Sequence, residues 1–165
     1  MYQKILSAAV LIICMYTDIR DRKISRFLLF LYLLLVCIGH ITEGTREAWM
    51  LTEQSAERLQ FVHVVGQGIL KRIKQVISGM LPGICCLIVS FLTRQALGYG
   101  DSILIIICGM ALGIEKMYAV LITGLFWAGI WAFIAWRFTG KSRSEEIPFV
   151  PFLFAGFMIQ SFSRI

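Results

Sequence analysis

Two aspartates occupy positions at which a lipid bilayer disfavours a charge. Asp18 follows the first apolar run, and Asp101 precedes a later one within Gly98-Tyr99-Gly100-Asp101. Placing an ionisable side chain in hydrocarbon costs roughly 2.5–3.5 kcal/mol, so such residues are functional candidates. Two carboxyls in a sheltered site cannot both ionise easily and would share one proton. One could activate a water molecule while the other protonates a leaving amine, which is aspartic-protease chemistry and requires neither a cofactor nor a metal.

The composition indicates a membrane protein. Of the 165 residues, 58% are hydrophobic and 16% are charged, whereas soluble domains average about 45–50% and about 25%. A domain of this size cannot hide that excess in its core, which disfavours a soluble helical bundle. The net charge of +6 comes mostly from Lys and Arg beside apolar runs, where they meet lipid headgroups, so no nucleic-acid partner is expected. The five cysteines form no C-x-x-C pair, which gives no support for a zinc site.

Six apolar runs predict an all-α, polytopic bundle of about six transmembrane helices in a single domain, residues 1–165. The runs are residues 5–17, 27–41, 76–93, 102–114, 117–136 and 149–162. Because a span needs about 20 residues, the two shortest runs must recruit polar neighbours. The first helix should extend past Asp18, and the fourth from near Gly98 to Lys116. Both aspartates then lie at the membrane edge or just inside it, and the two intervening spans place them on the same side.

The segment between the second and third spans is predicted in two parts. Residues 42–57 carry no clear periodicity and are interpreted as a loop. Apolar residues at helical spacing between positions 59 and 77 predict an interfacial amphipathic helix, with a plain linker as the alternative. The Lys and Arg counts on the two sides are equal. Only the dense cluster of basic residues in the loop at positions 18–26 predicts an orientation, in which the side of the membrane that carries the aspartates faces the cytosol.

The glycines around Tyr99 predict a break between the third and fourth helices. Gly98 and Gly100 free the backbone and would let a substrate backbone approach. Asp101 is then expected at the N-cap of the fourth helix. A glycine-rich turn with a capping aspartate is the alternative. Helix dipoles favour an ionised Asp101 at a helix N-terminus and a protonated Asp18 at a helix C-terminus.

At these residues the chain resembles the type IV prepilin leader peptidases, which are GxGD membrane aspartyl proteases. In that family a catalytic aspartate ends a span and is followed by basic residues and Ile-Pro-Asn. Asp18 and Ile24 match this pattern, with Ser25-Arg26 in place of Pro-Asn. The second catalytic aspartate lies in Gly-x-Gly-Asp, which Asp101 matches.

Two further positions bear on the resemblance. Ile103 stands where the family often has a lysine. The segment Ile147-Pro148-Phe149-Val150-Pro151-Phe152 resembles the Pro-Phe-x-Pro entry to the family's last span. A simple helix start is the alternative explanation for Pro148 and Pro151.

The resemblance implies a membrane endopeptidase with Asp18 and Asp101 as catalytic residues. The implied substrate contacts are Gly98, Tyr99, Gly100, Pro148 and Pro151. The implied substrate is a prepilin-like protein with a short basic leader before an apolar helix. Cleavage would occur at the cytosolic face of the cytoplasmic membrane, with pilus or secretion machinery as possible partners. The chain begins at the first peptidase span, so it is expected to be the short form without a methyltransferase part.

Two other functions remain open from the sequence. The aspartates could be the proton or cation site of a small transporter, although the last three spans are nearly all apolar. Alternatively, the chain could be an inactive scaffold of a pilus or secretion complex, given the departures at Ser25, Arg26 and Ile103.

Overall fold

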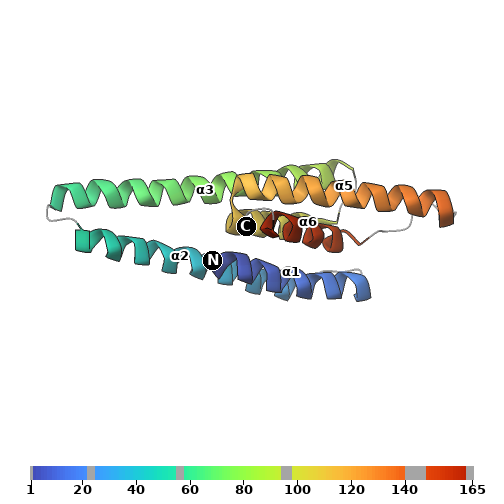
Figure 1. Cartoon of the computed structure of the whole chain (residues 1–165), viewed down its shortest axis with the longest axis horizontal. Helices are drawn as coiled ribbons and strands as arrows, with labels where there is room; N and C mark the ends of the chain where they lie inside the picture. The colour runs from blue at the N-terminus through green and yellow to red at the C-terminus, as the bar shows by residue number, and fades with distance from the viewer. Residues whose placement is uncertain (1, 22–24, 55–57, 94–97, 140–147, 163–165) are drawn as a thin grey trace.

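The fold is an elongated bundle of helices (Figure 1). The computed structural model describes residues 2–21, 25–54, 58–93, 98–139 and 148–162, and all regular structure within these ranges is helical. The helices are α1 (Tyr2–Asp21), α2 (Arg26–Gln54), α3 (Arg58–Leu92), α4 (Tyr99–Leu112), α5 (Ile114–Thr139) and α6 (Val150–Phe162). The predicted all-α bundle is therefore confirmed. Ile24 and Ile147 lie outside the described residues.

Four of the helices are long and apolar enough to cross a membrane. These stretches are Tyr2–Arg20, Arg26–Arg46, Gly66–Leu92 and Ile114–Arg137. The other two, α4 and α6, have 14 and 13 residues, or about 20 Å each at the helical rise of 1.5 Å. The long and short helices together form the bundle that the apolar runs predicted, but α4 and α6 are each shorter than a full membrane span.

The helices formed by the two short apolar runs extend beyond those runs at the ends that carry the aspartates. α1 continues past Asp18, and α4 begins directly after Gly98, as expected. The predicted continuation of α4 to Lys116 is wrong, because the helix ends at Leu112. Gly113 there adopts φ 81 and donates its N–H to the carbonyl of Gly109, a left-handed helix end that favours glycine.

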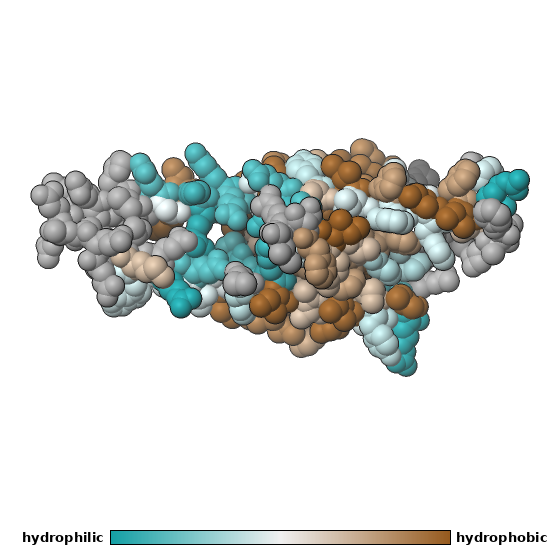
Figure 2. Space-filling view, in the orientation of Figure 1, coloured by the Kyte–Doolittle hydropathy of each residue, from teal (hydrophilic) through white to brown (hydrophobic). Residues whose placement is uncertain are grey.

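The connection between the second and third spans differs from the prediction. α2 runs on to Gln54, so most of the predicted loop is helical. The predicted amphipathic segment is helical too, but it is the first part of α3 and continues into the span without a break. Arg72 of α3 and Glu43 of α2 form an ion pair at 3.4 Å. The two helices therefore form a hairpin, and Figure 2 shows hydrophilic residues gathered over it.

Glycines allow α3 and α4 to pack with their backbones in contact. A Cβ atom on Gly79 would collide with the carbonyl oxygen of Gly109, and the reverse also holds. Gly83, four residues after Gly79, lies against the backbone of Ile106 in the same way. Small residues at this spacing are typical of close helix pairs in membranes. This packing fixes the position of α4, which carries Asp101.

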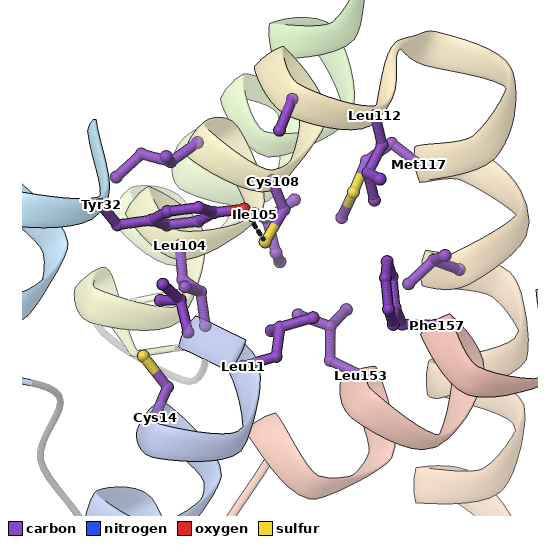
Figure 3. Close-up of a cluster of buried hydrophobic side chains, with 14 of the residues drawn as sticks. Leu11, Cys14, Tyr32, Leu104, Ile105, Cys108, Leu112, Met117, Leu153 and Phe157 are labelled. Atoms are coloured by element: carbon purple, nitrogen blue, oxygen red, sulfur yellow. Dashed lines mark hydrogen bonds between the residues drawn. The ribbon is translucent and has the colours of Figure 1, made fainter. Parts of the chain in front are cut away.

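The core lies where α1, α2, α4, α5 and α6 converge (Figure 3). Tyr32 of α2 is completely buried. Its hydroxyl donates to Ser7 Oγ at 2.8 Å and lies 3.6 Å from Cys108 Sγ. Ser7 in turn donates to the carbonyl of Gln3. These bonds satisfy the buried hydroxyl groups of Tyr32 and Ser7.

His40 lies inside α2. Its Nε2 is 3.0 Å from the carbonyl oxygen of Met110, one of the last carbonyls of α4, which have no partner within the helix. His40 therefore stabilises the C-terminal end of α4.

Candidate active site

Asp18 lies near the C-terminal end of α1 and is only 7% exposed. The backbone N–H of Val150 donates to its Oδ2 at 3.2 Å. Val150 is the first residue of α6, and the first N–H groups of a helix have no partner within it. The carboxyl of Asp18 thus caps the N-terminus of α6, although the two are far apart in the sequence. This contact joins the ends of α1 and α6.

Asp101 lies in the first turn of α4, but it is not the N-cap. Gly98 holds the N-cap position with φ −61 and ψ 136, which corrects the sequence-based assignment. The carboxyl of Asp101 folds back over Gly98: a Cβ atom on Gly98 would lie 2.9 Å from Asp101 Oδ2. The absence of a side chain at Gly98 therefore gives this carboxyl its space.

The structure brings the two carboxyls together. Helices α1 and α4 are in contact, and Asp101 is close enough to Asp18 for their charges to interact. The buried thiol of Cys14, one helical turn before Asp18, is within electrostatic reach of both carboxyls. In Figure 1 the C-terminal end of α1 and the N-terminal end of α6 lie toward the same end of the bundle.

The helix dipoles do not distinguish the two carboxyls. Asp101 is in the first turn of α4, and Asp18 accepts the first N–H of α6. Each therefore lies at the positive end of a helix. The prediction from the sequence took account only of the α1 dipole near Asp18. Because the α6 dipole acts on Asp18 as well, the helix dipoles no longer indicate which carboxyl is protonated.

The other candidate residues surround this pair. Tyr99 is 40% exposed, Gly98 is exposed and Gly100 is half-buried on α4. Half-buried Pro148 precedes α6, and half-buried Pro151 lies in its first turn. These prolines flank the Val150 N–H that reaches Asp18.

Sequence reasoning missed two members of the site. One is the backbone N–H of Val150 and the other is Cys14. The prolines were a usable signal for the first, because proline in the first turn marks where a helix starts and hence where its free N–H groups lie. No feature of the neighbouring sequence distinguished Cys14 from the other cysteines, which also lie in apolar runs.

α5 extends well beyond the level of the two carboxyls. Gly124 packs against Leu153, with its Cβ position 3.3 Å from Leu153 Cα. α6 begins three residues before Leu153, whereas α5 continues to Thr139 (Figure 1). The stretch of α5 from the start of α6 to Trp136 measures about 14 Å at the helical rise.

This projecting part of α5 is apolar on all sides. No residue between positions 125 and 137 is buried. The large side chains it exposes are Leu125, Phe126, Trp127, Trp131, Phe133, Ile134 and Trp136. A helix that is apolar all round belongs in a hydrophobic environment, which here is lipid. This apolar stretch therefore extends about 14 Å beyond the start of α6, where Asp18 lies.

The arrangement suits acid–base chemistry between two carboxyls. Within the described ranges, no group of three or more His, Cys, Asp or Glu side chains could hold a metal ion.

Comparison with known proteins identifies a family. The model of the type IV leader peptidase family matches residues 5–133, which is most of the chain. The matched region contains Asp18 and the Gly98–Asp101 segment and ends before Pro148. No curated protein and no solved structure matches the chain.

Proposed function

This chain belongs to the type IV leader peptidase family, whose members are aspartic prepilin peptidases, and we propose that Asp18 and Asp101 are its catalytic pair. The observation that carries this proposal is that Asp18, which accepts the first N–H of α6, lies near enough to Asp101 in the first turn of α4 for their charges to interact. The rest of the proposal concerns how this pair works, which substrate it takes and which side of the membrane it faces.

The two carboxyls share one proton in the resting enzyme. The ionised carboxylate takes a proton from water, and the resulting oxygen attacks the carbonyl carbon of the scissile peptide. The protonated carboxyl hydrogen-bonds the carbonyl oxygen, which carries the developing charge. When the C–N bond breaks, the leaving nitrogen receives a proton from the pair. The Val150 N–H orients Asp18, and the space over Gly98 orients Asp101.

The substrate is a prepilin-like protein with a short basic leader followed by an apolar helix. Its apolar helix reaches the carboxyls from the lipid, alongside the projecting end of α5. The exposed backbone of Gly98 and the half-buried Gly100 let the extended scissile segment approach Asp101. Tyr99, Pro148 and Pro151 contact the residues on either side of the cleaved bond. The basic leader is attracted by the acidic pair.

The aspartate side of the membrane is the cytosolic face of the cytoplasmic membrane, with pilus or secretion machinery as the partner that uses the product. The dense basic loop after α1 supports this orientation, as does the resemblance to GxGD peptidases. Reporter fusions after residue 139 and after the last residue test it. The first should report a cytosolic position and the second a position across the membrane.

The decisive experiment is cleavage of a synthetic prepilin-like peptide by the purified protein in detergent, followed by mass spectrometry. Asp18→Asn and Asp101→Asn should each reduce cleavage by at least about a thousandfold. Glu115→Gln removes an exposed carboxyl from the first turn of α5 and should retain full activity. Normal cleavage by either Asn variant would contradict the assignment.

The same assay separates the alternatives. A wild-type protein that binds the peptide without cutting it would favour an inactive scaffold. Proton flux into liposomes that requires both aspartates, in the absence of cleavage, would favour a transporter.

A further inference from the structure

A second site lies at the opposite end of the bundle from the aspartates. Four helices converge there around a small pocket that is partly open to its surroundings. Its polar lining consists of Lys4 of α1, Lys116 of α5, and Gln160 and Ser161 of α6. The apolar lining consists of Leu112, Val120 and Phe157. One face of the pocket is therefore cationic and hydrogen-bonding, and the other is hydrocarbon.

The polar lining has no counter-charge. No described residue forms an ion pair with Lys4 or Lys116, and no carboxylate lines the pocket. Glu115, the residue before Lys116, is exposed and does not line the pocket. Two ammonium groups at one pocket repel each other unless an anion lies between them. The amide of Gln160 and the hydroxyl of Ser161 add hydrogen-bond donors for the same anion.

The position of the pocket along the helices indicates the source of that anion. Lys4 is near the start of α1, Lys116 is near the start of α5, and Ser161 is near the end of α6. In Figure 1 the start of α1 and the end of α6 lie at similar positions along the bundle. Lysines at the ends of apolar helices meet the headgroup layer. The apolar lining belongs to the hydrophobic core, with Leu112, Val120 and Phe157 each 6% exposed or less, so it closes the inner side of the pocket.

We propose that this pocket binds the phosphate group of an anionic phospholipid in the leaflet opposite the aspartates. The phosphate bridges Lys4 and Lys116, and an acyl chain follows the adjoining apolar surface. Such a lipid would link α1, α4, α5 and α6, of which α1, α4 and α6 carry Asp18, Asp101 and Val150 at their other ends. The proposal does not depend on the peptidase assignment.

The test measures the thermal stability and lipid adducts of the full chain in detergent. Phosphatidylglycerol should raise the midpoint of unfolding of the wild-type protein and remain bound in native mass spectrometry. Phosphatidylcholine should do neither. Lys4→Gln with Lys116→Gln should weaken phosphatidylglycerol binding by about tenfold or more.

The matched control removes two charges on the same side but outside the pocket. Lys71→Gln with Lys74→Gln alters exposed residues of α3 and should leave binding unchanged. Equal loss in both double variants, or no loss in either, would overturn the site. A shift of equal size with inorganic phosphate would overturn the lipid as its ligand. Should the pocket double variant fail to fold, Lys116→Gln alone is compared with Lys71→Gln by the same criteria.

Discussion

The backbone N–H of Val150 donates a hydrogen bond to Oδ2 of Asp18 across 132 residues of sequence. This bond makes the start of α6 part of the candidate active site, although the family match ends at residue 133. It also gives the prolines a physical role, since Pro148 and Pro151 flank the residue whose N–H is used. The geometry of Asp18 is therefore set by a backbone group whose position depends on where α6 begins.

Removing the Val150 N–H should lower activity without unfolding the protein. Val150 is the first residue of α6, a position that tolerates proline, so Val150→Pro deletes the donor at small cost to the helix. A hydrogen bond to a charged acceptor is worth about 1.5–3 kcal/mol, which corresponds to a loss of kcat of roughly 10- to 100-fold. Cleavage assays normalised to folded protein measure this loss.

Val150→Ala is the control for that experiment. It removes the buried side chain but retains the N–H, so it should lower stability more than activity. If Val150→Ala and Val150→Pro lost the same activity, packing rather than the hydrogen bond would explain the effect.

Gly98→Ala should displace the carboxyl of Asp101. The new Cβ atom would lie 2.9 Å from Oδ2, which is closer than carbon and oxygen approach without a shift. We expect kcat to fall by at least about tenfold, because displacement of a catalytic group by less than 1 Å has a large effect on rate. Gly129→Ala on α5, where a Cβ meets no atom within 4 Å, should keep wild-type cleavage. An active Gly98→Ala enzyme would show that Asp101 does not need this space.

Gly79→Ala should destabilise the pair formed by α3 and α4. Its Cβ would collide with the Gly109 carbonyl, and backbone cannot move aside as a flexible side chain can, so a cost of about 1–3 kcal/mol is expected. Gly66→Ala in the same helix meets no atom within 4 Å and should be neutral or stabilising. Thermal unfolding in detergent compares the two. Equal midpoints would mean that the helices are farther apart in the membrane.

The projecting end of α5 should lie in lipid. In a variant that keeps Trp131 and replaces the other three tryptophans with phenylalanine, lipids brominated on their acyl chains should quench the fluorescence. Aqueous iodide should quench it weakly. The reverse pattern would place this end of α5 in water and the two carboxyls at the membrane surface.

The apolar runs and the motifs were enough to predict much of this protein. The lengths of the runs indicated the helices, and the shortness of the first and fourth runs indicated that their helices must include Asp18 and begin near Gly98. These features follow from the cost of leaving apolar residues in water or charges in lipid, which each stretch of sequence determines locally.

The errors arose where a helix is stabilised by a distant partner. The helical end of α2 pairs with α3 through Glu43 and Arg72, and no local periodicity marked it. The assignment of Asp101 as an N-cap was off by three residues, because helix starts depend on backbone angles that composition does not specify.

The sequence by itself determined that the chain is a helical membrane protein with two exceptional carboxyls. Only the tertiary structure decided that Asp18 caps α6, that Gly98 makes room for Asp101, and that Lys4 and Lys116 share a pocket. The first and the last of these relationships join atoms that helix packing brings together, whereas the second depends on the backbone angles at the start of α4. Packing depends on the fit between surfaces from distant parts of the chain, which no local pattern of residues encodes.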